Sequence, residues 1–226
     1  MHIEPGVVSG AKMGLSLATA GASFGVLLKS SWTAIKSQGL ISLILRSLIS
    51  AVLVFCFFEV LPKHPIGVSE VHFILGSTLF LLFGPAAAGV GLTAGLLLQG
   101  MFFAPTDLPM YFVNITTLLA PLMLVSIIAK KIIPANTAYK DVTYKQALAL
   151  STAYQGGIVA WVAFWALYGQ GFGAENMASI GSFGAAYMIV IVFEPLVDLG
   201  VLAGAKALHQ MKDSPLFHDR LYNNAA

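Results

Sequence analysis

Apolar residues occur in long runs along this chain, and polar residues gather in the short stretches between the runs. A helix that crosses a bilayer needs about 20 consecutive apolar residues. Seven segments approach this length, at residues 11–28, 41–61, 70–84, 86–103, 112–129, 146–168 and 180–205. Only Gly84-Pro85 separates the short third and fourth segments, so they form either two helices with a tight turn or one kinked region. The pattern predicts an all-α membrane bundle of about seven transmembrane helices.

Composition agrees with this class. Of the 226 residues, 58% are hydrophobic and 10% are charged, and the mean hydropathy is +0.84. A soluble domain carries about 25% charged residues, so we expect an integral protein of the lipid bilayer. The net charge is only +2 and the basic residues lie in loops, which argues against nucleic acid as a partner. We expect one transmembrane domain at 1–205 and a polar tail at 206–226.

The basic residues predict the orientation, because cytoplasmic loops of membrane proteins are enriched in Lys and Arg. They occur between segments one and two (Lys29, Lys36), between five and six (Lys130, Lys131, Lys140, Lys145) and after segment seven (Lys206, Lys212, Arg220). With seven crossings, these three regions share one side of the membrane. We therefore expect a cytoplasmic carboxy terminus and an amino terminus outside.

The chain opens Met1-His2, which is a candidate chelate for a metal ion. The α-amine of Met1, the backbone nitrogen of His2 and the His2 imidazole can close two fused rings, and planar nitrogen donors suit nickel or copper. The alternative is that His2 has no ligand role and belongs to a poorly ordered terminus. A signal peptide beginning at Lys12 would remove His2, but the apolar run continues to Leu28, so we expect the terminus to be retained.

His72 is the second candidate ligand. The predicted topology places it at the outer end of the third segment, on the same membrane face as the amino terminus. A histidine at a membrane interface is also common without any ligand role.

Three further polar residues lie in apolar segments, where such residues are costly and usually face a partner or a cavity. Glu194 and Asp198 share one face of the last segment, and we favour a structural or gating role over metal ligation. Asn114 begins the fifth segment, where it either caps the helix or orients a ligand histidine.

Sequence motifs of ATP-binding and hydrolytic sites are absent: there is no Gly-x-x-x-x-Gly-Lys-Ser/Thr, no HExxH and no CxxC. If transport is active, its energy comes from another subunit or an ion gradient. The rival classes are a membrane scaffold or sensor and an ion-driven secondary transporter.

Several ordered motifs resemble one known family. They are Met1-His2-Ile3 with Gly6, Ser69-Glu70-Val71-His72, Leu75-Gly76, Phe83-Gly84-Pro85, the block 95–100 that ends Gln99-Gly100, and Val113-Asn114. Together they resemble the metal-binding membrane component of energy-coupling factor transporters for cobalt and nickel, of the CbiM/NikM type. The likeness covers most of residues 1–125 and is diffuse beyond 130, where Pro195 replaces a glycine that often follows the residue matching Glu194.

The resemblance implies a transported Co²⁺ or Ni²⁺ ion held by Met1, His2 and His72. We take Asn114, Glu194 and Glu70 as the supporting or gating candidates. The resemblance also implies seven membrane helices in a bacterial inner membrane. It implies a transmembrane coupling subunit and separate ATP-binding subunits, with a small auxiliary membrane protein in some systems. The central block is more like the cobalt branch, and nickel is the alternative cargo.

Overall fold

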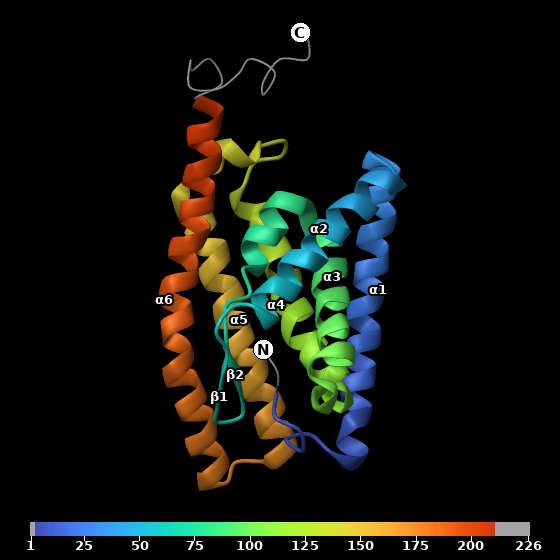
Figure 1. The fold of residues 1–226 in the computed structure, drawn as a ribbon, viewed down its shortest axis with the longest axis vertical. Coiled ribbons are helices and arrows are strands. Elements are labelled where there is room, and N and C mark those ends of the chain that lie inside the picture. The colour runs from blue at the N-terminus through green and yellow to red at the C-terminus, as the bar shows by residue number, and fades with distance from the viewer. Residues whose placement is uncertain (1–2, 211–226) are drawn as a thin grey trace.

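The computed structural model describes residues 3–210, and helices dominate it (Figure 1). Within this range, six helices are long and apolar enough to cross a membrane. They are α1 (Met13–Gln38), α2 (Leu40–Glu59), α3 (Gly76–Phe102), α4 (Tyr111–Ile132), α5 (Tyr144–Gln170) and α6 (Ala174–Gln210). Short 3₁₀ turns, η1 (Gly10–Lys12), η2 (Pro105–Met110) and η3 (Tyr139–Asp141), lie in the connections. The all-α membrane bundle is therefore confirmed.

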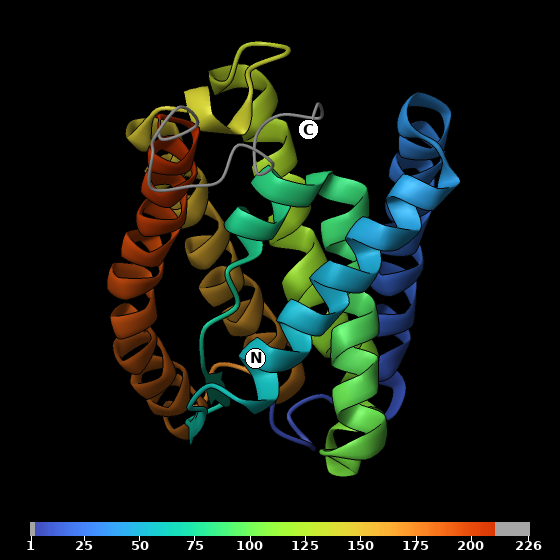
Figure 2. The same ribbon diagram turned by 45° about the horizontal axis from the view of Figure 1, so that its top comes forward.

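The expected count of seven helices is not confirmed, and the difference lies in the third segment. Residues 70–84 begin in a strand, continue as extended chain to Leu75 and become helical only at Gly76. Two helical turns later, Gly84 breaks the helix with φ 81° and ψ 166°, and Pro85 starts the long part of α3. The first part of this apolar run therefore returns toward the other end of the bundle as extended chain, and a short helix follows it (Figure 2). It crosses as extended chain because α6 supplies the missing hydrogen-bond partners, as described below.

A short hairpin precedes this crossing. Strand β1 (His64–Ile66) pairs antiparallel with β2 (Ser69–Val71). The amino-terminal segment adds to the hairpin, because Ile3 forms a bridge with Ser69 and the Glu4 amide donates to the Val68 carbonyl at 3.1 Å. This small sheet lies beside the lower half of the bundle in Figure 1.

Small residues let α2 and α3 approach closely. A Cβ at Gly91 would overlap Ser50, and a Cβ at Gly95 would overlap Val54. The Gly91-x-x-x-Gly95 motif therefore packs within the bundle. The helix α2 crosses the bundle obliquely (Figures 1 and 2), so its last turn reaches the interior beside the hairpin.

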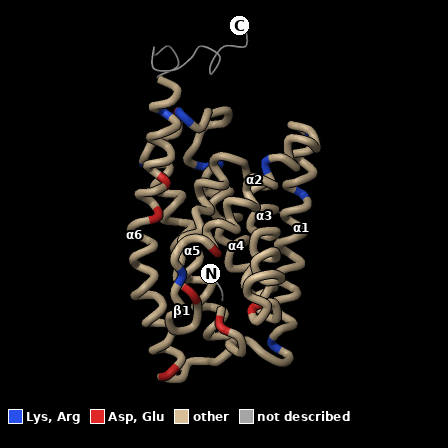
Figure 3. The backbone as a smooth tube through the Cα atoms, in the orientation of Figure 1, with Lys and Arg blue, Asp and Glu red and all other residues tan. Residues whose placement is uncertain are grey.

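The two ends of the bundle differ in charge (Figure 3). The end that carries the α1–α2 turn and the α4–α5 loop holds most of the lysines, and we call it the basic end. The opposite end carries η2 and the α5–α6 turn and holds Asp107 and Glu175. The asymmetry agrees with the predicted basic cytoplasmic side, and the orientation of the termini stays a prediction.

Candidate functional site

His72 lies on the extended segment between β2 and α3 and is 2% exposed. Its Nδ1 lies 3.0 Å from the Phe73 carbonyl oxygen, and its ring meets the buried Phe58 ring edge-on at 4.9 Å between centroids. When Nδ1 carries the proton and donates to this carbonyl, Nε2 keeps a lone pair for a metal ion. Backbone and aromatic packing thus set both the tautomer and the direction of the ring.

The amino-terminal strand is fixed to the same sheet. Ile3 is completely buried, and its amide donates to Oδ1 of Asn114 at 2.8 Å. Asn114 is itself 1% exposed and lies inside α4, whose first turn has Met110 at the N-cap position. The expectation that Asn114 caps this helix is therefore wrong, because its acceptor oxygen holds the backbone that directly follows His2.

Glu194 holds the other side of the site. Its carboxylate accepts the Ile74 amide at 2.9 Å and the Leu75 amide at 2.7 Å, and the Gln155 side chain donates to it as well. Leu75 has a left-handed conformation, with φ 54°, and both residues precede the first residue of α3, so neither amide has an acceptor within that helix. Glu194 therefore fixes the chain immediately after His72, which agrees with the structural role expected for it.

Asp198 continues this support one helical turn further along α6. It accepts the Ser77 hydroxyl at 2.5 Å and the Thr78 hydroxyl. Glu194 thus supplies the acceptors for the backbone amides before α3, and Asp198 fixes the first turn of α3 through its hydroxyl side chains. This is why an apolar segment can cross the bundle as extended chain.

The third supporting candidate, Glu70, lies on β2 opposite Pro65 and is half-buried. It belongs to a group of carboxylates near the amino-terminal strand. Burial raises the pKa of Glu4, and the negative charges of Glu70 and Asp107 raise that pKa further. The potential around this strand is therefore negative and favours the approach of a divalent cation.

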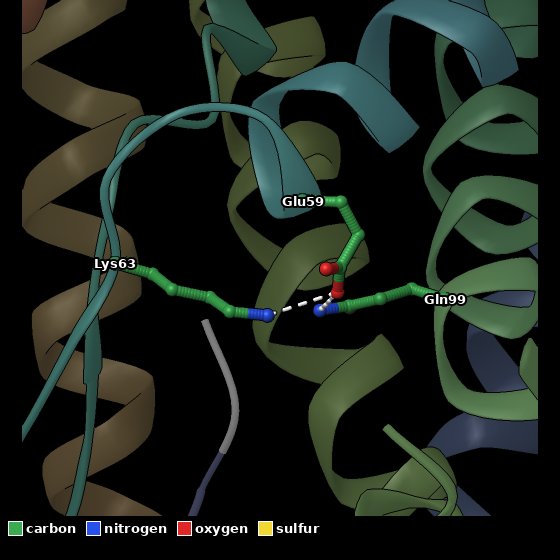
Figure 4. Close-up of polar contacts among 3 residues, drawn as sticks. All are labelled: Glu59, Lys63 and Gln99. Atoms are coloured by element: carbon green, nitrogen blue, oxygen red, sulfur yellow. Dashed lines mark hydrogen bonds and ion pairs between the residues drawn. The ribbon is translucent and has the colours of Figure 1, made fainter. Parts of the chain in front are cut away.

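One polar cluster beside the hairpin was missed by sequence reasoning. Glu59 Oε1 accepts both the Lys63 ammonium at 2.9 Å and the Gln99 amide at 2.8 Å (Figure 4). Gln99 is completely buried, so the cluster ties the start of the hairpin loop to α2 and α3. The spacing of Glu59 and Lys63 at i and i+4 was the available signal, whereas nothing local pairs either residue with Gln99.

The predicted ligands Met1 and His2 lie outside the described residues. Two other histidines lie within the described residues: His64 is exposed on β1, where it pairs with Val71, and His209 contacts Lys140 at 2.9 Å at the basic end. Among residues 3–210, no three side chains of His, Cys, Asp or Glu converge in a group able to hold a metal ion.

Comparison with known proteins gives a family and a fold. The family model for the cobalt uptake substrate-specific transmembrane region, CbiM, matches residues 2–210. No curated protein matches the chain. A crystal structure of a truncated transition metal transporter is similar with TM-score 0.67 and 18% identity, over 92% of this chain and 99% of that one. A crystal structure of a transition metal transporter is similar with TM-score 0.66 and 16% identity, over 100% of both chains.

Proposed function

Because the chain belongs to the CbiM family of cobalt uptake substrate-specific transmembrane regions, we propose that it is the metal-binding membrane component of an energy-coupling factor importer. Its cargo is a divalent transition metal, with Co²⁺ favoured and Ni²⁺ as the alternative of the same donor preference. The coupling subunit and the ATP-binding subunits are separate proteins, and a small auxiliary membrane protein joins them in some systems. The complex lies in a bacterial inner membrane.

The observation that carries this proposal is the double anchoring of one small sheet. Ile3, held by Asn114, and Ser69 are bridge partners, and His72 follows three residues later on the same segment. Two residues of extended chain reach at most about 7 Å. Chain length therefore allows the Met1 amine and the His2 nitrogens to bind the same ion as His72, which supports the proposed ligand set.

In the proposed mechanism, the ion binds four nitrogens: the Met1 amine, the His2 backbone and imidazole nitrogens, and Nε2 of His72. The carboxylates at this end of the bundle attract the cation, and its binding displaces the protons of the amine and the amide. Affinity therefore falls at acid pH, because the donors must lose protons to bind. Release follows when the partner subunits separate the amino-terminal strand from His72.

Isothermal titration with Co²⁺ and Ni²⁺ tests the proposal on untagged protein. We expect a 1:1 complex, loss of high-affinity binding in His72→Ala, and the same loss when one residue is added ahead of Met1. His209→Ala is the matched control and should bind as the unmodified chain does. Wild-type affinity after the extension or in His72→Ala would refute the ligand set.

A further inference from the structure

A groove runs between α1 and α4 at the basic end of the bundle, far from the site described above. Its volume is about 540 Å³. Its deeper part is apolar and includes Val26 and Leu27 of α1 and Leu119 and Leu122 of α4. Its shallow end is polar and includes Lys29, Ser30, Thr33 and Lys130.

The groove is as long as one leaflet is thick. Both helices run toward the basic end as their residue numbers rise, so polarity increases toward the membrane surface along both walls. From Leu119 to Lys130, α4 rises about 16 Å at 1.5 Å per residue. The hydrocarbon core is about 30 Å thick, so the groove spans one half of it.

The two lysines at the mouth of the groove are Lys29 and Lys130. Both are exposed, and within the part of the chain that the structure describes neither forms a hydrogen bond or an ion pair. Among residues 3–210, no carboxylate lines the groove. By contrast, the neighbouring Lys36 ammonium lies 5.1 Å from the centre of the Trp32 ring. The mouth therefore offers two unneutralised positive charges beside hydroxyl groups.

A second hollow adjoins the mouth on the other side of α4. It has a volume of about 310 Å³ and shares Pro85, Ser126 and Lys130 with the groove. The side chains of Thr137 and Tyr139 line it as well. Lys130 therefore lies between the apolar groove and a smaller hollow that is lined by residues with hydroxyl groups.

We propose that this groove is a binding site for one anionic phospholipid. An acyl chain lies along the apolar walls, and the phosphate lies between Lys29 and Lys130. Basic pockets between membrane helices bind such headgroups in this way. A partner helix does not fit, because a helix about 10 Å wide that rises 1.5 Å per residue needs roughly 120 Å³ per residue. The groove would hold about one turn of it.

Native mass spectrometry of the detergent-purified full chain tests this site with phosphatidylglycerol and phosphatidylcholine as the added lipids. We expect one retained phosphatidylglycerol and weaker retention of phosphatidylcholine. The double variant Lys29→Gln/Lys130→Gln should lose roughly 30-fold in affinity for phosphatidylglycerol. The control pair Lys36→Gln/Lys131→Gln changes charge equally on the same helices and should retain the lipid.

A second variant, Ser126→Trp, fills the groove without changing its charge and should also lose the bound lipid. Circular dichroism and gel filtration confirm that each variant is folded. Equal loss in both lysine pairs would reduce the effect to general surface charge and overturn the site. Equal retention of the two lipids, or full retention in folded Ser126→Trp, would overturn it too.

Discussion

Replacing Asn114 with alanine tests whether the amino-terminal strand must be docked for metal binding. The change removes the acceptor of the completely buried Ile3 amide and leaves that amide without a partner. A buried polar group without its hydrogen bond costs about 1–3 kcal/mol. The docked strand therefore becomes less stable relative to the undocked one by this amount.

The expected effect on affinity follows from this energy. The apparent dissociation constant rises as the fraction of docked protein falls, so 1–3 kcal/mol corresponds to at most roughly 5- to 150-fold weaker binding. If docking of the amino-terminal strand is strongly favoured in the unmodified chain, the loss of metal affinity is smaller. Isothermal titration of untagged protein with Co²⁺ measures it directly.

Thr143→Ala is the matched control, because it should cost a similar free energy at the opposite end of the bundle. Thr143 and Gln146 form a capping box at the start of α5, and loss of such a cap costs about 0.5–2 kcal/mol. This variant should lower the melting temperature and leave the Co²⁺ affinity unchanged. If Asn114→Ala also kept its affinity, or if both variants weakened binding equally, the docking argument would be refuted.

Three further changes probe the supports of the site. Glu194→Gln leaves one of the two backbone amides that Glu194 accepts without an acceptor oxygen. Thermal unfolding should therefore show a free energy of unfolding lower by about 1–3 kcal/mol. The exposed Glu175→Gln is the control and should leave the free energy of unfolding unchanged. Burial and neighbouring carboxylates raise the pKa of Glu4 above its usual 4.5, so the folded chain binds this proton more tightly than the unfolded chain. The protonated Glu4 carboxyl therefore stabilises the fold at acid pH, and this contribution is lost as pH rises through the folded pKa. The melting temperature should therefore vary less with pH in Glu4→Gln than in the unmodified chain. Gly84→Ala forces a side chain into a backbone conformation that only glycine adopts easily, so it should lower the free energy of unfolding by about 1–3 kcal/mol. Gly21→Ala is the control: Gly21 lies in a helix with open space around it, so this variant should not lower the melting temperature.

Run length and composition predicted a segment for each of the six long helices, because a spanning helix must be long and apolar whatever it packs against. The ends were less predictable: α6 covers Ala174–Gln210, although its apolar run covers only 180–205. Polar residues continue a helix for a turn or more beyond the apolar core at no great cost. The proposed division at residue 205 therefore stays a prediction.

The third segment could not be predicted from its own residues. Apolar composition indicates burial, but it does not distinguish a helix from an extended chain whose amides find acceptors elsewhere. Those acceptors lie 119 and 120 residues away, on Glu194. The role of Asn114 was missed for the same reason, since its partner Ile3 is 111 residues away. Polarity marked both residues as important, and only the fold shows what they bind.

The buried polar side chains are needed because parts of the backbone in the bundle are not helical. Backbone amides in a membrane interior need acceptors within the protein, and helices satisfy their own amides. The strand at Ile3 and the segment after His72 cannot do this, and Asn114 and Glu194 supply what they lack. These two side chains are therefore needed for folding as well as for the proposed metal site. Only variants whose loss of metal affinity exceeds that of an equally destabilised control, such as Thr143→Ala, separate the two roles.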